Sequence, residues 1–139
     1  MSTARLQGKK ILIVDDDEDI LGSIDLAMRA EGAATEMVTD GNAAVNACDG
    51  DGPDVVVLDM MLPKRSGFLV LERIKQQDEP PVVVMITANQ GKRHMASAES
   101  LGVDAYLVKP VPLQRLVETV VRLLAANGQP AEGEPEASR

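Results

Sequence analysis

Three aspartates, a threonine and a lysine come directly after short apolar runs of this sequence. Asp15 and Asp16 follow the first run, Asp59 follows the third, and Thr87 and Lys109 follow the fourth and fifth. Carboxylates that meet at one place repel each other unless one is protonated or a cation lies between them. A divalent ion such as Mg²⁺ relieves that repulsion, and it binds one or two carboxylates together with water and phosphate oxygens. These residue types therefore predict chemistry on a phosphoryl group, with an aspartate as the nucleophile.

The lysine and the threonine favour this interpretation over a plain acidic surface cluster, which the aspartates alone would also fit. The ammonium group of Lys109 can pair with a carboxylate and neutralise a phosphoryl oxygen. The hydroxyl of Thr87 can donate a hydrogen bond to such an oxygen. The next acids, Asp17, Glu18 and Asp19, are predicted to occupy the first turn of a helix, where negative charge opposes the helix dipole.

The apolar runs are predicted to be the strands that position these side chains. Four of the five are apolar nearly throughout, which is typical of parallel strands covered on both faces, and the second alternates, which places it at an edge. Strands that alternate with helices predict a doubly wound α/β fold with a five-stranded parallel sheet, where function collects at the carboxyl ends of the strands. The predicted strands are residues 11–14, 34–38, 55–58, 82–86 and 105–108.

Segments with apolar residues every three or four positions separate the runs and predict five helices. The first ends before Gly32, and the last begins at Pro112 and ends near Asn127 and Gly128. Glycines after the last apolar residue are typical helix ends. The predicted helices lie around residues 20–28, 42–48, 69–74, 95–101 and 113–124.

Length and composition restrict the class of protein. The 139 residues suffice for one compact domain, and the net charge of -8 argues against binding to nucleic acid. No apolar run reaches the length of a membrane span, and residues 1–10 lack a secretory signal, so we expect a cytoplasmic protein without membrane contact. Residues 1–8 are expected to form an N-terminal arm, 9–126 the domain, and 127–139 a disordered acidic tail.

Four motifs in this order resemble the CheY-like receiver domain of two-component response regulators, over about residues 9–126. They are ILIVDD, VVVLDMMLPKRSG, VMITA and GVDAYLVKP, and each follows or contains a predicted strand. The resemblance implies a flavodoxin-like sheet with strand order 2-1-3-4-5 and five helices.

The resemblance also implies a role for each matching residue. Asp59 would accept the phosphoryl group. Asp15 and Asp16 match the acidic pair that binds Mg²⁺, with Asp16 as the direct ligand, and Met61 would offer its backbone carbonyl to the metal. Thr87 and Lys109 match the residues that bind phosphoryl oxygens.

Four further positions match the family. Pro63 and Gly67 would shape the loop after Asp59, and the bond before Pro110 would be cis. Tyr106 would be the switch residue, which turns inward when Thr87 is drawn toward the phosphoryl group. The surface formed by the fourth helix, fifth strand and fifth helix would then change.

The function implied is that of a stand-alone signalling switch, because no output domain is expected after residue 126. A histidine kinase or a histidine phosphotransfer protein would supply the phosphoryl group, and a protein partner would read the result. Its only catalysis would be its own phosphorylation and dephosphorylation. The alternatives are a relay intermediate or phosphate sink, a Mg²⁺-dependent phosphohydrolase with an aspartate nucleophile, and a flavin-binding protein. His94 is expected to be a solvated surface residue, and Cys48 a small buried filler.

Overall fold

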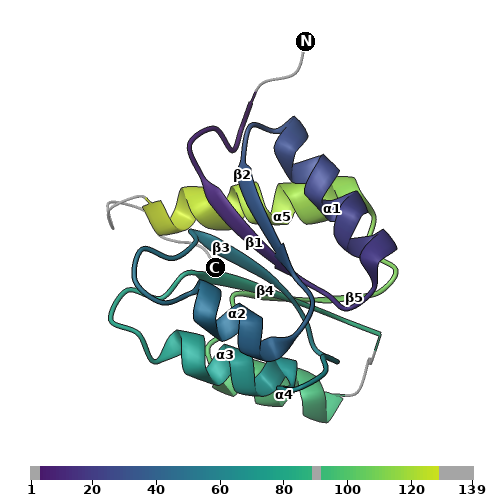
Figure 1. Cartoon of the computed structure of the whole chain (residues 1–139), viewed down its shortest axis with the longest axis vertical. Coiled ribbons are helices and arrows are strands. Elements are labelled where there is room, and N and C mark those ends of the chain that lie inside the picture. The colour runs from purple at the N-terminus through teal and green to yellow at the C-terminus, as the bar shows by residue number, and fades with distance from the viewer. Residues whose placement is uncertain (1–3, 89–91, 129–139) are drawn as a thin grey trace.

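The computed structural model describes residues 4–88 and 92–128, which form a five-stranded parallel sheet between two layers of helices (Figure 1). The strand order is β2-β1-β3-β4-β5, so the predicted fold class and strand order are confirmed. The alternating strand β2 lies at an edge, also as predicted. The strands are β1 Lys10–Val14, β2 Ala34–Val38, β3 Val55–Asp59, β4 Val82–Thr87 and β5 Ala105–Val108.

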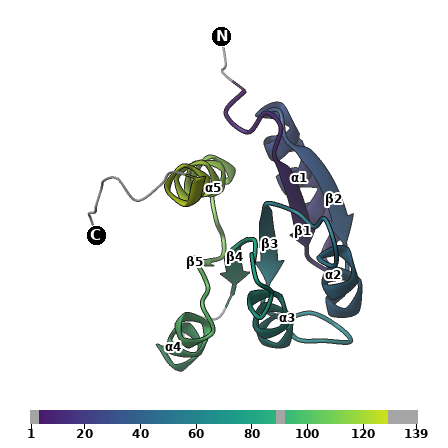
Figure 2. The ribbon, with the colours of Figure 1, turned by 90° about the vertical axis from the view of Figure 1, so that its left-hand side faces the viewer.

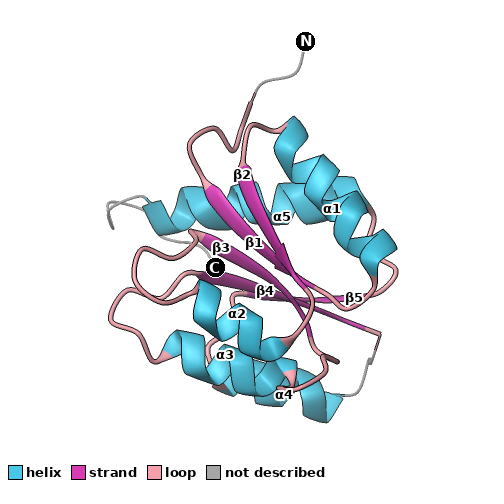
Figure 3. Ribbon diagram, in the orientation of Figure 1, coloured by secondary structure: helices cyan, strands magenta, loops and turns pink. Residues whose placement is uncertain are grey.

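Each predicted helix is present (Figure 3). Side-chain caps fix where three of them begin. Asp17 was expected inside the first turn of α1 but caps it instead, because its side chain accepts hydrogen bonds from the backbone N–H groups of Asp19 and Ile20. Asp40 and Ser66 cap α2 and α3 in the same way. The helices are α1 Glu18–Ala30, α2 Gly41–Ala47, α3 Gly67–Lys75, α4 Lys92–Ser100 and α5 Leu113–Gly128.

The sheet lies between two layers of helices (Figure 2), and an aliphatic core fills the space on each of its faces. Residues Ile11, Ile13, Val55 and Val57 point to the face covered by α1 and α5. Their neighbours along the same strands point to the opposite face, which α2, α3 and α4 cover. Because helices cover both faces of the sheet, β3 and β4 are buried along their whole length. This burial explains their uninterrupted apolar sequences.

Residues 4–9, before β1, are more closely attached to the domain than the expected arm over residues 1–8 would be, and residues 1–3 of that arm lie outside the described residues. Leu6 is only 1% exposed and belongs to the core under α1 and α5. Its N–H donates to the carbonyl of Glu31, and Arg5 forms an ion pair with the Glu31 side chain at 3.1 Å. The side chain of Leu6 therefore completes the first core.

At the other end, α5 extends to Gly128, two residues beyond the boundary expected for the domain. The remainder of the expected tail, residues 129–139, lies outside the described residues. Among the residues that the structure describes, no helix is both long and apolar enough to cross a lipid bilayer.

Candidate functional site

The three predicted aspartates meet at the carboxyl edge of the sheet. Asp15 follows β1, Asp16 is next to it, and Asp59 is the last residue of the neighbouring strand β3. One carboxylate oxygen from each lies within 4.8 Å of the other two. Asp15 and Asp59 are 2% and 4% exposed, whereas Asp16 is open to solvent.

Lys109 joins this cluster from the end of β5. Its Nζ lies 3.5 Å from Oδ2 of Asp15 and 3.5 Å from Oδ1 of Asp59, so one ammonium group stands beside two buried carboxylates. Its backbone N–H donates to the carbonyl of Thr87 at 2.7 Å, which fixes the lysine next to the end of β4. The structure therefore brings the predicted acids and the predicted cation together.

The charge of this cluster is not balanced by Lys109. The pKa of Asp59 is raised above its ordinary value, first by burial and then by the charge of Asp15. The ammonium group of Lys109 and the N–H of Met61, which donates to Oδ1 at 3.4 Å, lower it by less. The site thus holds excess negative charge around Asp59.

We expect Asp59→Asn to stabilise the metal-free protein at neutral pH. A raised pKa means that the folded state holds the Asp59 proton more tightly than the unfolded chain, so folding is favoured at low pH and loses this contribution as the pH rises through the folded pKa. Removal of the charge should raise the free energy of unfolding at pH 7. The gain should vanish as the pH falls toward the ordinary value of 3.8.

Urea unfolding in EDTA across this pH range measures the effect. Asp78→Asn, which removes an exposed carboxylate between α3 and β4, is the control and should change little. A lower stability of Asp59→Asn at pH 7 would contradict the prediction.

Thr87 and Tyr106 lie on adjacent strands beside this cluster. Thr87 ends β4 and is fully buried, and its hydroxyl lies 3.6 Å from the sulfur of Met60. Tyr106 is half-buried on β5 and packs against the core under α2, α3 and α4. Burial raises the pKa of Tyr106, and a hydrogen bond with Thr87 partly offsets the rise. The two predicted switch residues are therefore in contact.

The predicted loop residues follow Asp59 closely. Gly67 opens α3, and a Cβ at that position would lie 2.6 Å from the backbone oxygen of Asp59, so only glycine fits there. Pro63 lies midway along the loop, and its carbonyl accepts from the N–H of Arg65 at 2.7 Å. The side chain of Met61 is 67% exposed. The peptide bond between Lys109 and Pro110 is cis.

This arrangement fits a bound Mg²⁺ ion. The acidic group offers only oxygen ligands, as Mg²⁺ prefers, and its uncompensated negative charge is what a divalent cation would neutralise. Asp15, Asp16 and Asp59 are the residues that would hold the ion.

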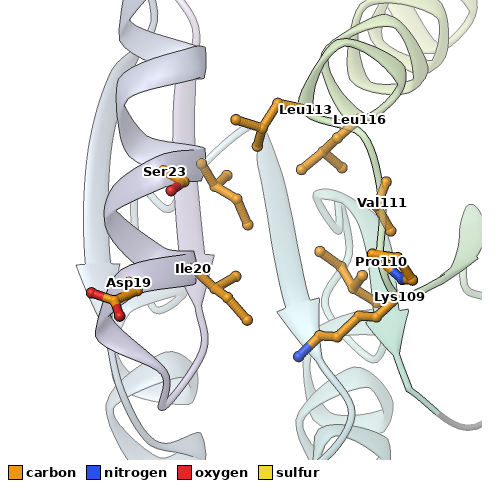
Figure 4. A pocket seen from close by; sticks show the side chains of 10 residues that line it. Asp19, Ile20, Ser23, Lys109, Pro110, Val111, Leu113 and Leu116 are labelled. Atoms are coloured by element: carbon orange, nitrogen blue, oxygen red, sulfur yellow. The ribbon is translucent and has the colours of Figure 1, made fainter.

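An apolar groove of about 560 Å³ opens beside the cluster, between α1 and α5 (Figure 4). The side chain of Lys109 borders the groove. Ile20 of α1 lies on one side of the groove, and Val111, Leu113 and Leu116 lie on the other. Sequence reasoning did not find this groove, because its walls come from segments almost ninety residues apart in the chain.

His94 does not lie free in solvent, and that expectation was wrong. Its ring on α4 is half-buried and stacks on Phe68 of α3, with the ring centroids 5.9 Å apart and the planes 8° from parallel. The ring contact joins α3 and α4, which are successive helices on the same face of the sheet. Cys48 is buried as expected, and burial raises the pKa of its thiol to about 11, which makes it a poor nucleophile.

Fold and site together define a flavodoxin-like α/β domain with an acidic cation site at the carboxyl edge of its sheet. The family model for the response regulator receiver domain matches residues 11–121 of the sequence. The chain therefore belongs to this family of two-component signalling domains. Receiver domains are phosphoacceptor switches that bind Mg²⁺ at an acidic site and interact with histidine kinases.

Curated relatives share about a third of their aligned residues with this chain. The sensory transduction protein RegX3 of Mycobacterium tuberculosis is 34% identical over 118 residues, which cover 85% of this chain and 52% of that protein. The regulator of RpoS of Escherichia coli K12 is 35% identical over 123 residues, 88% of this chain and 36% of that protein. The chain therefore spans about half the length, or less, of these relatives.

Solved receiver domains share the fold over nearly their whole length. A CheY-like receiver domain of Methanospirillum hungatei superposes with a TM-score of 0.81 and 27% identity, covering 85% of this chain and 94% of that one. The receiver domain of the sensor histidine kinase PA1611 of Pseudomonas aeruginosa has a TM-score of 0.77 and 25% identity, covering 85% and 98%. That structure has a magnesium ion coordinated in its active site cleft.

Proposed function

We propose that this chain is a switch that is set by phosphorylation of Asp59. The observation that carries the proposal is the meeting of Asp59 with two further carboxylates and with the ammonium group of Lys109. A carboxylate oxygen of Asp59 attacks the phosphorus of the donor, the bond from phosphorus to the donor nitrogen breaks, and the nitrogen keeps the electron pair. The product is an acyl phosphate on Asp59.

The surrounding residues stabilise the charge that develops in this transfer. Asp15, Asp16 and Asp59 would hold a Mg²⁺ ion, which would supply positive charge to the phosphoryl oxygens. Lys109 lies close enough to Asp59 to pair with one of those oxygens once its carboxylate partner is esterified. Thr87 supplies a hydroxyl donor from the end of β4, and the backbone carbonyl of Met61 completes the proposed ligand set.

The donor is a sensor histidine kinase or a histidine phosphotransfer protein, and the groove between α1 and α5 supports its docking there. Reacting atoms must come within about 3–3.5 Å of each other, so a donor protein has to bind next to Asp59. The groove is apolar and is bordered by Lys109, which itself contacts Asp59. A partner seated on Ile20 and Leu113 would therefore present its phosphohistidine at the carboxyl edge.

The output proposed is a change of the surface formed by α4, β5 and α5. Tyr106 and Thr87 are hydrogen-bonded. A phosphoryl group that draws the Thr87 hydroxyl toward itself would therefore shift the populations of the Tyr106 side-chain conformations. A protein partner would read this surface, or the phosphoryl group would pass on along a relay. The absence of nucleic-acid binding stays a prediction for the domain, since relatives that are longer than this chain include the transcriptional regulatory protein PrrA.

Incubation with acetyl phosphate and Mg²⁺, followed by intact mass measurement, tests the proposal. The wild-type protein should gain one phosphoryl group, and neither the EDTA-treated protein nor Asp59→Asn should gain any. An undiminished adduct on Asp59→Asn would overturn the assignment of the acceptor. Sustained hydrolysis of a small phosphomonoester would instead point to a phosphohydrolase.

A further inference from the structure

The loop after the proposed phosphoacceptor, residues 60–66, is held against the start of α2. The N–H of Gly41 donates to the carbonyl of Pro63 at 3.2 Å. On one side of this bond, Nζ of Lys64 lies 3.8 Å from Oδ2 of Asp40. On the other, Nε of Arg65 donates to Oδ1 of Asn42 at 3.0 Å. Residues 40–42 at the start of α2 thus contact residues 63–65 of the loop.

The backbones approach so closely that no side chain fits between them. A Cβ added to Gly41 would lie 2.1 Å from the backbone oxygen of Arg65 and 2.5 Å from its Cβ. Distances this short force one of the two segments to move. The neighbouring Lys64 has a positive φ of 71°, which few residues other than glycine adopt. The contact with α2 holds the loop in this conformation.

The same connection between β2 and α2 also reaches the other half of the carboxylate cluster. The carbonyl of Val38, the last residue of β2, accepts a hydrogen bond from the N–H of Asp15 at 3.2 Å. On the loop side, the N–H of Met61 donates to Oδ1 of Asp59 at 3.4 Å. Residues 38–42 therefore link the segment that carries Asp15 to the loop that carries Met61.

We infer that Gly41 is a positioning residue for the magnesium site: its close contact with Pro63 and Arg65 fixes the loop that places Met61 beside Asp59. The inference rests on the proposed function for the role of Met61. Gly41 itself touches neither the metal nor the phosphoryl group. Residues that hold metal ligands in place commonly change metal affinity by about 10–100-fold when they are altered.

Gly41→Ala tests this role, and Gly22→Ala is its matched control. Gly22 lies in α1, and a Cβ there would have no atom within 4 Å. In calorimetric titrations with Mg²⁺, Gly41→Ala should raise the dissociation constant about tenfold. At saturating Mg²⁺, its rate of phosphorylation by acetyl phosphate should return close to that of the wild type. Gly22→Ala should match the wild type in both measurements.

A measurement without metal separates positioning from a general loss of structure. In Mg²⁺-free NMR spectra, the amide signals of Asp59 and Met61 should move in Gly41→Ala and stay in place in Gly22→Ala. Unchanged amide signals and an unchanged Mg²⁺ affinity in folded Gly41→Ala would overturn the inference. If Gly41→Ala does not fold, Arg65→Ala removes the exposed contact to Asn42 instead. A Mg²⁺ affinity equal to that of the wild type would then overturn it.

The outcomes also separate this inference from the proposed function. Failure of the wild-type protein and of Gly22→Ala to gain a phosphoryl group would refute the function, and the affinity and amide measurements would still decide the role of Gly41. A phosphorylated wild-type protein with an unaffected Gly41→Ala would refute the positioning role alone.

Discussion

Lys109→Met should lower the rate at which acetyl phosphate phosphorylates Asp59 by about 10²–10³-fold, the usual effect of removing one donor that stabilises developing negative charge. The variant keeps an unbranched side chain that is one atom shorter, but it loses the ammonium group that lies 3.5 Å from Asp59 and from Asp15. It should also be destabilised by about 3 kcal/mol in the absence of Mg²⁺, because two buried carboxylates lose a shared cation.

Lys75→Met is the matched control for this substitution. Lys75 also forms a close ion pair, 2.8 Å from Asp104, but Asp104 precedes β5 and so lies at the opposite end of the sheet. Its loss should cost about 1 kcal/mol of stability and leave the phosphorylation rate within about twofold of the wild type. Rates from intact mass measurements, with urea unfolding in parallel, separate the two effects. Equal phosphorylation rates in Lys109→Met and Lys75→Met would contradict a role for Lys109 in the transfer.

Asp16→Asn should weaken Mg²⁺ binding by about 10–100-fold or more. Substitutions of residues that only orient a metal ligand already reduce metal affinity by that factor. Asp16 belongs to the acidic group but is exposed, so its charge contributes little to folding. The variant should therefore unfold at nearly the same urea concentration as the wild type in EDTA. Added Mg²⁺ should stabilise it less, because the stabilisation by a bound ligand grows with the logarithm of its concentration divided by its dissociation constant.

The next residue offers a control with the same change of charge. Asp17 caps α1 through its side-chain oxygen, and asparagine is an equally good cap. Asp17→Asn should therefore keep both the helix and the Mg²⁺ affinity close to those of the wild type. If the two variants lost the same affinity, the general negative charge of the segment would explain metal binding, and a specific ligand role for Asp16 would fail.

The sheet and the edge at which the acids meet could be predicted because their signals are local. β3 and β4 are covered on both faces and read as continuous apolar runs. Parallel strands end at one edge, so Asp59 and Lys109 were expected at the same edge of the sheet once the strands were assigned. The register of the sheet then brings Asp15 alongside.

The features that sequence reasoning missed depend on contacts between distant segments. His94 stacks on Phe68 because α3 and α4 are neighbours on one face, which no helical periodicity reveals. Leu6 lies in a segment without apolar periodicity, and only the folded chain shows the core that it completes. Gly41 lies just before the predicted helix over residues 42–48, but the approach of Arg65 that requires a glycine comes from 24 positions further on.

The composition makes Tyr106 a built-in optical probe. The chain has one tyrosine and no tryptophan, so ultraviolet emission excited near the tyrosine band comes from this single ring. The hydroxyl of Tyr106 is hydrogen-bonded to Thr87, and Thr87 lies next to the acidic cluster. Its emission intensity and near-ultraviolet dichroism therefore report directly on the environment of β5, without a label and without background from other fluorophores.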